Sequence, residues 1–169
     1  HKLMNKKIKL AVVGVGAMGL KHIDAIKKTK GAELSAVVDL KENSFIKKIN
    51  SNFYTSIRDM FKFEKIDGVI VATPNASHFR DSLEVIKNKC TVLIEKPITT
   101  NSKDTEKLIS VAKKMKVEIL VGHHRRHNPL MQKAKELIDN NMLGKVRTIN
   151  INCQMYKPCL LYTSDAADE

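Results

Sequence analysis

The sequence predicts an α/β fold with a doubly wound parallel sheet, and three observations support this prediction. Short runs rich in β-branched residues alternate with helical stretches of about a dozen residues, the order expected of β-α-β units. The runs are almost continuously apolar, as at residues 68–72, which is typical of strands that helices cover on both faces. A length of 169 residues provides one full domain with a core, and not two.

The first half of the predicted sheet comes from three short runs of strand-forming residues. In chain order, we expect a strand at residues 8–13, a helix at 17–30, a strand at 34–38, a polar helix at 42–50 and a strand at 53–54. Gly31 is a suitable C-terminal stop for the first helix, because glycine readily ends helices. The second strand leads directly to Asp39.

The second half continues the same alternation. We expect a helix at residues 57–63, a strand at 68–72, a helix at 76–88, a strand at 91–95, a helix at 102–115 and a strand at 117–121. After Gly122 the pattern changes, and a polar, histidine-rich segment leads into a helix that ends near Asn141. Alternating apolar and polar residues then predict a strand at 146–154, for which the chain offers no visible partner.

A glycine-rich turn connects the first strand directly to the first helix. Gly14 permits the tight turn, Gly16 lets the backbone approach a pyrophosphate, and Gly19 lets the helix pack against the strand. The helix begins at Ala17 and Met18, and the unpaired N–H groups of a helix N-terminus favour a bound diphosphate. This pattern predicts a dinucleotide-binding fold of the Rossmann type.

Asp39 is the acidic residue that such a fold requires, and it stands 20 residues after Gly19. At the end of the second strand, its carboxylate can bind both hydroxyls of the adenosine ribose. The same carboxylate repels a 2′-phosphate, so we expect NAD as the cofactor and NADP as the less favoured one. Lys41 is near enough in sequence to soften this preference.

Three further segments follow later strands of the predicted sheet. They are residues 72–78 (Ala-Thr-Pro-Asn-Ala-Ser-His), residues 95–97 (Glu-Lys-Pro) and residues 122–129 (Gly-His-His-Arg-Arg-His-Asn-Pro). All three belong at the carboxyl edge of the sheet, where open α/β folds bind their ligands. With the glycine turn, in this order and at this spacing, they resemble the Gfo/Idh/MocA family of glucose–fructose oxidoreductases and inositol dehydrogenases. The resemblance covers roughly residues 7–158.

This resemblance implies an NAD-dependent dehydrogenase that transfers a hydride between the nicotinamide and a secondary alcohol of a sugar, an inositol or a related polyol. Further cofactor contacts are implied for Ala72, Thr73, Pro74, Asn75, His78, Glu95, Lys96, Pro97 and Arg125. Lys96 is the implied catalytic residue, and its peptide bond to Pro97 is implied to be cis. A physical reason supports Lys96 independently, because a fixed ammonium in a dry cleft stabilises the alkoxide that hydride loss builds.

The family's second domain supplies an Asp and a His downstream of the lysine, and that His acts as general base. The chain ends before such a motif, and neither His123 nor His127 matches its position. We therefore expect the segment alone to bind NAD without turnover. The alternative function is a non-catalytic dinucleotide sensor or regulatory protein on the same fold, which would not need Lys96.

Composition argues against several other partners. The net charge of +12 is the balance of 30 basic and 18 acidic residues, and the basic residues are 25 Lys and only 5 Arg. Nucleic-acid readers concentrate arginine and aromatic side chains, so we expect no nucleic-acid partner. No apolar run approaches the roughly 20 residues of a membrane helix, so we expect no membrane partner.

Arginines separate His124 from His127 and would oppose a cation, so we expect no metal. Three cysteines without metal-type spacing fit a cytoplasmic protein, and for the full-length protein we expect a homo-oligomer.

We accordingly expect a dinucleotide-binding domain at residues 4–122, the truncated start of an α+β substrate domain at 123–158, and a non-native tail at 159–169. The tail contains no lysine, although the preceding residues hold 25. Its sequence, Cys-Leu-Leu-Tyr-Thr-Ser-Asp-Ala-Ala-Asp-Glu, resembles the translation of a transposon-based sequencing adaptor. We therefore expect these residues to play no part in the fold.

Overall fold

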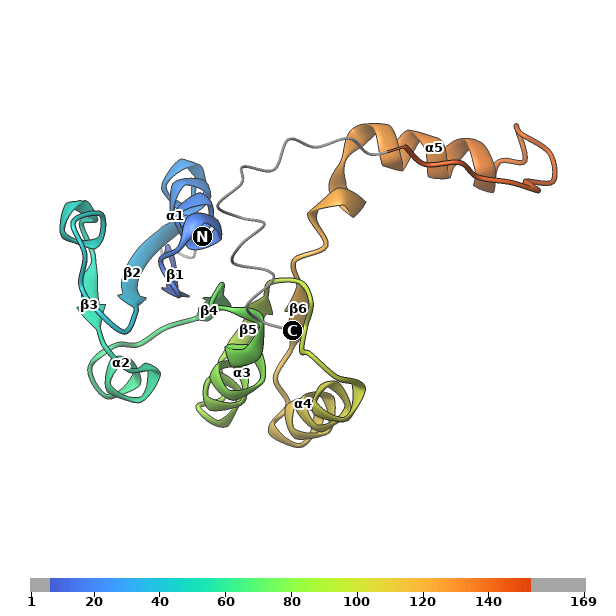
Figure 1. The fold of residues 1–169 in the computed structure, drawn as a ribbon. Coiled ribbons are helices and arrows are strands. Elements are labelled where there is room, and N and C mark those ends of the chain that lie inside the picture. Colours follow the sequence, from blue (N-terminus) through green and yellow to red (C-terminus); the bar gives the residue numbers. More distant parts are fainter. Residues whose placement is uncertain (1–6, 153–169) are drawn as a thin grey trace, which may run out of the picture. The chain divides into compact units, whose positions relative to one another are not determined.

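A parallel sheet forms the centre of the computed structural model, which describes residues 7–152 (Figure 1). The strands are β1 (Ile8–Val13), β2 (Ala32–Val38), β3 (Asn52–Tyr54), β4 (Gly68–Val71), β5 (Thr91–Ile94) and β6 (Ile119–Val121). They lie in the order β3-β2-β1-β4-β5-β6, and every pair is parallel. The chain builds outward from β1 in both directions, so the strand order reverses between β1 and β4. This topology confirms the predicted doubly wound sheet.

Helices cover both faces of the sheet (Figure 1). One face carries α1 (Ala17–Lys28) and the 3-10 turn η1 (Ile46–Lys48), and the other carries α2 (Ile57–Phe63), α3 (His78–Lys87) and α4 (Ser102–Met115). Successive residues of a strand point to opposite faces, so Val12 packs with α1 whereas Val13 packs with the other helices. The central strands are therefore apolar at nearly every position. On β6, by contrast, Leu120 is 51% exposed.

Polar caps set where two of the helices begin. The Ser56 hydroxyl accepts a hydrogen bond from the N–H of Asp59 at 3.1 Å, and the Asn101 side chain accepts one from the N–H of Asp104 at 2.9 Å. Such caps satisfy N–H groups that have no partner inside the helix. The bounds of α2 and α4 accordingly agree with the predicted helices at 57–63 and 102–115.

The polar helix that we expected at residues 42–50 is wrong, because this segment contains only the short η1. Its Asn43 side chain accepts hydrogen bonds from the N–H groups of Phe45 at 3.0 Å and Ile46 at 2.9 Å. Asparagine that bonds to nearby backbone in this way competes with regular helix formation. Ile46 is the segment's one buried residue, so packing against the sheet supports no longer helix.

The strand that we expected at residues 146–154 is also wrong over its described part, since residues 146–152 adopt no strand. An isolated strand cannot satisfy its backbone hydrogen bonds, and the sequence had offered no partner for this one. Residues 153 and 154 lie outside the described part of the chain. The expected tail at 159–169 lies outside it as well.

The chain divides into two compact units between His124 and Arg125, close to the domain boundary that we expected at residue 122. The second unit contains α5 (Pro129–Asp139), which follows the turn η3 (His124–His127). The Asn128 side chain caps α5 by accepting the N–H of Leu130 at 2.9 Å. Leu130 is 79% exposed, so this helix presents apolar surface. The domain boundary stays a prediction.

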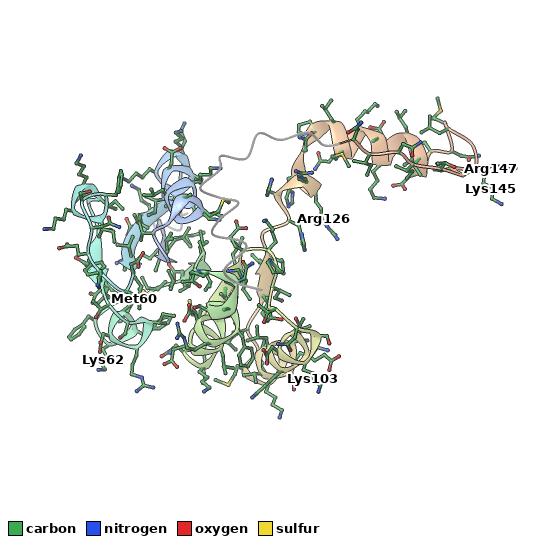
Figure 2. The ribbon with its side chains drawn as sticks, in the orientation of Figure 1. Met60, Lys62, Lys103, Arg126, Lys145 and Arg147 are labelled. Atoms are coloured by element: carbon green, nitrogen blue, oxygen red, sulfur yellow. The ribbon has the colours of Figure 1, made fainter. Side chains whose placement is uncertain are left out.

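Exposed lysine side chains lie on the helices that cover the sheet. Lys62 on α2 and Lys103 on α4 are exposed and project away from the sheet (Figure 2). In the part of the chain that the structure describes, no helix combines the length and apolar character needed to cross a membrane.

Candidate functional site

A cleft of about 870 Å³ opens at the carboxyl edge of the sheet, on both sides of the point where the strand order reverses. Eight of the residues predicted from the sequence line it: Gly14, Gly16, Ala17, Met18, Asp39, Ala72, Thr73 and Pro74. They follow β1, β2 and β4, which are neighbours in the sheet. The cleft therefore occupies the position where doubly wound folds bind ligands.

The three glycines of the turn meet different demands. Gly14 has φ of +87°, and a Cβ there would lie 2.7 Å from the backbone nitrogen of Thr73. A Cβ on Gly19 would lie 1.9 Å from the carbonyl oxygen of Gly14. At Gly16 a Cβ would meet no atom of residues 7–152 within 4 Å, so packing within this part of the chain does not require glycine there. The open space beside Gly16 is room for a ligand against the backbone.

The N-terminus of α1 has features that suit an anion. Gly16 occupies the N-cap position and supplies no side-chain cap, and the first turn contains no acidic residue. The N–H groups of the first turn of a helix have no partner within the helix and carry partial positive charge. Ala17 and Met18, in this turn, line the cleft. A diphosphate fits this arrangement.

Asp39 is fixed by the backbone on both sides of its carboxylate. One oxygen accepts the N–H of Val15 at 2.7 Å, and the other accepts the N–H of Leu40 at 2.7 Å. Because each carboxylate oxygen can accept more than one hydrogen bond, the group keeps capacity for ribose hydroxyls. The bond to Val15 also ties the acidic residue to the glycine turn.

The segment after β4 divides between the cleft wall and the core. Thr73 lines the cleft, and its buried hydroxyl has no hydrogen-bond partner among residues 7–152. Asn75 is exposed but does not line the cleft. His78 is only 1% exposed and lies behind the wall, where its ring nitrogens contact the carbonyl oxygens of Pro97 at 2.7 Å and Thr73 at 2.8 Å.

Glu95 is a buried carboxylate at the end of β5, 6% exposed. One of its oxygens lies 2.8 Å from Nε2 of His22 on α1, and the other accepts the N–H of Lys96 at 3.2 Å. A Cβ on Gly122 would approach the carboxylate carbon to 3.1 Å, so the glycine leaves room for it. The pairing with His22 was not predicted, because it joins residues 73 positions apart.

Lys96 and Pro97 are exposed at the end of β5, beside β4 in the sheet, and neither lines the cleft. The peptide bond between them is cis, as the resemblance implies. Arg125 belongs to the second unit and is exposed. The roles of these three residues stay predictions.

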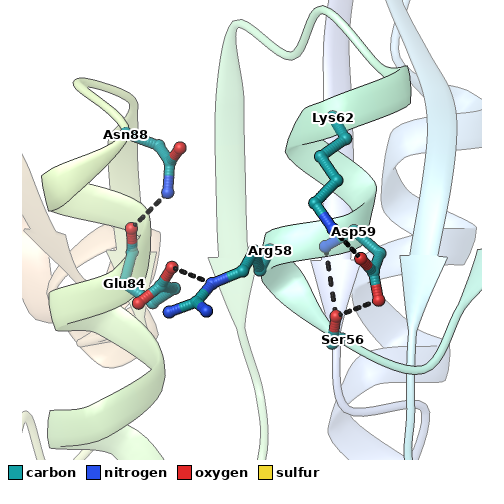
Figure 3. Close-up of polar contacts among 6 residues, drawn as sticks. All are labelled: Ser56, Arg58, Asp59, Lys62, Glu84 and Asn88. Carbon is teal, nitrogen blue, oxygen red and sulfur yellow. Dashed lines mark hydrogen bonds and ion pairs between the residues drawn. The ribbon is translucent and has the colours of Figure 1, made fainter.

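The residues of the outer wall of the cleft were not predicted from the sequence. They are Thr55, Ser56, Ile57 and Arg58 after β3, and Arg80, Asp81 and Glu84 on α3. Figure 3 shows Arg58 reaching across to Glu84, with 3.7 Å between Nε of the arginine and a carboxylate oxygen. The residues after β3 were predictable, because they follow the carboxyl end of the short strand predicted at 53–54, just as the other predicted site residues follow their strands. The three residues on α3 were predictable as one surface of the predicted helix, because Glu84 lies three residues after Asp81 and four after Arg80.

Next to this wall, the first turn of α2 contains a carboxyl group, that of Asp59, whose pKa is shifted. Hydrogen bonds from Lys62 and from Ser56 lower the pKa of the Asp59 carboxyl below its usual range (Figure 3). The carboxylate thus stays ionised beside the first turn of α2, which favours negative charge.

Among residues 7–152, no group of three or more His, Cys, Asp or Glu side chains could hold a metal ion, and His123, His124 and His127 are exposed.

Known proteins are similar to this chain in sequence and in fold. Residues 8–123 match the family described as "Oxidoreductase family, NAD-binding Rossmann fold". Oxidoreductase P35 from Formosa agariphila is 31% identical over 153 residues, 88% of this chain and 48% of its own length. Inositol 2-dehydrogenase from Corynebacterium glutamicum is 29% identical over 153 residues, 85% of this chain and 44% of its own length. The chain thus spans about half the length of the curated relatives that it matches.

A solved structure agrees with these sequence matches. The scyllo-inositol dehydrogenase of Lactobacillus casei, with bound NAD(H) and scyllo-inositol, superimposes with a TM-score of 0.78 at 25% identity, over 83% of this chain and 43% of that one. The matched family, the topology and the glycine turn all agree. The chain belongs to the Gfo/Idh/MocA oxidoreductase family, with an NAD-binding Rossmann fold.

Proposed function

We propose that the whole protein is an NAD-dependent dehydrogenase that moves a hydride between NAD and a secondary alcohol of a sugar, an inositol or a related polyol. The observation that carries this proposal is the succession of β1, β4 and β5 as neighbours in the sheet. The glycine turn follows β1, Thr73 follows β4 and Lys96 follows β5. A cofactor held by the first two segments would lie beside the third.

The residues of the cleft fit this cofactor. The N-terminus of α1, whose N-cap residue Gly16 has no side chain to cap it, would hold the pyrophosphate in the space where a Cβ on Gly16 would meet no atom of residues 7–152. Asp39 would accept the hydroxyls of the adenosine ribose. The buried, unpartnered hydroxyl of Thr73 offers a hydrogen bond on the cleft wall. Bound NAD⁺ supplies the hydride acceptor.

Lys96 would act on the substrate oxygen. When the carbinol carbon loses its hydride and the hydroxyl its proton, negative charge develops on that oxygen in the transition state, and a positioned ammonium stabilises it. The hydrogen bond from the Lys96 N–H to Glu95 fixes the backbone from which the side chain extends. Removal of the hydroxyl proton requires a general base, which we assign to none of the described residues.

The names of the relatives support the substrate class. One curated relative is an inositol 2-dehydrogenase and one solved relative holds scyllo-inositol, so we propose an inositol, a sugar or a related polyol as the substrate of this protein. We also propose a cytoplasmic location and a homo-oligomeric full-length protein. The free thiol of Cys90 supports the cytoplasmic location, because disulfides are rare in that compartment. The exposed apolar surface of α5, which includes Met131, supports a homo-oligomer.

The test is to assay the whole polypeptide encoded in the source genome with NAD and a panel of inositols and sugars, following NADH absorbance. We expect turnover with at least one polyol, and we expect Lys96→Ala to lower kcat by about 10²–10³. Lys103→Ala is the matched control, because Lys103 is an exposed lysine on α4. Full activity of Lys96→Ala, or no turnover with any polyol, would contradict the proposal.

A further inference from the structure

The lining of the cleft differs in charge from the chain as a whole. Its charged side chains are three carboxylates and two guanidinium groups, namely those of Asp39, Asp81, Glu84, Arg58 and Arg80. The whole chain has a formal net charge of +12, yet this lining has one negative charge in excess. Like charges gathered in a cleft disfavour a further anion. A dinucleotide without a 2′-phosphate therefore suits the cleft better than one that carries it.

Arg58 is the side chain that would work against this preference, because a nearby arginine is what accommodates a 2′-phosphate in folds of this type. It lies near Asp39, since β2 and β3 are parallel neighbours and the N–H of Asp39 donates to the carbonyl oxygen of Tyr54 at 3.1 Å. Arg58 follows four residues later, in the first turn of α2. Its side chain is 75% exposed, so the guanidinium is accessible to a ligand in the cleft.

Glu84 on α3 faces Arg58 from the opposite wall (Figure 3). Nε of the arginine lies 3.7 Å from a carboxylate oxygen of the glutamate. Asp59, which follows Arg58 in sequence, is bound instead by Lys62 and by Ser56. Exposed ion pairs add little to the stability of a fold, so the main effect of this pair is local. It sets a carboxylate against the guanidinium that a 2′-phosphate would need.

We infer that Glu84 is a specificity-determining residue for the cofactor, because it pairs with Arg58 and withholds that guanidinium from a 2′-phosphate. NADP gains the arginine only when the ion pair separates, and its phosphate then lies near an unpaired carboxylate. NAD has a hydroxyl in that position and meets neither cost. The second arginine of the lining, Arg80, is paired in the same way with Asp81 at 3.0 Å. This inference rests on the proposed function, since it concerns which dinucleotide the same cleft binds.

A double-mutant cycle, with calorimetric titration of NADH and NADPH into the chain, tests the inference. We expect Glu84→Gln to reduce the preference for NADH over NADPH by about tenfold, because Arg58 becomes available to the 2′-phosphate. Arg58→Gln added to that variant should remove most of this change. Arg58→Gln alone should alter the preference by less than about threefold, since the arginine is already paired. Glu106→Gln is the matched control, because Glu106 is an exposed glutamate on α4.

Two results would overturn the inference while NADH still binds. One is an unchanged preference in Glu84→Gln. The other is an equally large change in Glu84→Gln whether or not Arg58→Gln is present, because the carboxylate would then act on the phosphate without the arginine. Neither side chain is buried, so we expect every variant to melt as cooperatively as the wild type. Absence of saturable NADH binding by the wild type would overturn the proposed function, and this inference with it.

Discussion

At the scale of single residues, Asp39 has two tasks in the cleft. It binds the backbone N–H groups of Val15 and Leu40, and it presents negative charge where the adenosine ribose would lie. A neutral amide keeps the size of the side chain but does not repel a 2′-phosphate. We therefore expect Asp39→Asn to reduce the preference for NADH over NADPH by about tenfold, or about 1.4 kcal/mol.

Titration calorimetry with both cofactors measures this preference. Asp24→Asn is the matched control, because Asp24 is an exposed carboxylate on α1 that pairs with Lys28 at 2.6 Å. An unchanged preference in Asp39→Asn would show that other groups, such as Lys41, decide between the cofactors.

Cys90 provides a prediction about pH. Burial, aided by the nearby charge of Asp67, raises the pKa of its thiol from 9.0 to about 11. Between these values the unfolded chain loses the thiol proton and the folded chain keeps it, so the folded state becomes less stable as the pH rises. We expect the free energy of unfolding to fall from about pH 9 upward, and Cys90→Ala to remove part of that slope in urea titrations. Identical slopes would contradict this account.

Reactivity of the same thiol gives an independent check. Because the thiolate is the reactive form and burial disfavours it, we expect alkylation of Cys90 in the native chain only as fast as the chain unfolds. Mass spectrometry of the peptide that contains Cys90 measures this rate. Rapid native alkylation at neutral pH would show an accessible thiolate instead.

The residues of the site that were predictable from sequence are those with local patterns. Gly14, Gly16 and Gly19 occur within six positions, and Asp39 follows at the end of the next strand. The pairing of His22 with Glu95 was not predictable, because no local spacing connects α1 with the end of β5. Burial of His78 was not predictable either, since its motif gave it a place beside the ligand.

At the scale of elements, two glycines near the turn between β1 and α1 have different roles: Gly19 is needed for packing, and Gly16 leaves space for the ligand. Gly19→Ala would push a Cβ to within 1.9 Å of the Gly14 carbonyl oxygen, so we expect a loss of about 1–3 kcal/mol in the free energy of unfolding. The new methyl group of Gly16→Ala would meet no atom of residues 7–152 within 4 Å, so we expect the free energy of unfolding to stay within about 1 kcal/mol of the wild-type value. The NADH affinity of this variant should nevertheless fall by about tenfold or more, because the new methyl group fills ligand space.

Each variant is the control for the other in this pair. Chemical denaturation gives the stability, and calorimetry gives the affinity. If Gly16→Ala bound NADH as tightly as the wild type, the pyrophosphate would not lie against this turn.

Capping explains which elements the sequence predicts well. Ser56 and Asn101 stand at the N-caps of α2 and α4, and both helices were predicted with correct bounds. Asn43 has the same chemistry, but its side chain bonds to Phe45 and Ile46 in a turn that does not continue. A polar residue of this type thus marks a helix only when an apolar face follows to pack on the sheet.

At the scale of the whole molecule, the first unit contains both core clusters, and every residue of these clusters precedes residue 122. We therefore expect a polypeptide of residues 4–122 to melt cooperatively and to bind NADH within about threefold of the affinity of the whole chain. Arg125, which the resemblance assigns to the cofactor, is absent from this polypeptide. A much larger loss, reproduced by Arg125→Ala in the whole chain, would show that the second unit supplies a main cofactor contact.

Above all, we expect the carboxyl edge of the sheet to bind NAD(H) at one site. Titration calorimetry of NADH into the chain tests it most directly. The account predicts saturable binding with one cofactor per chain, competed by NAD⁺ and lost in Gly16→Val while cooperative melting is retained. No saturable binding by a cooperatively melting wild-type chain, or equal binding by Gly16→Val, would contradict it.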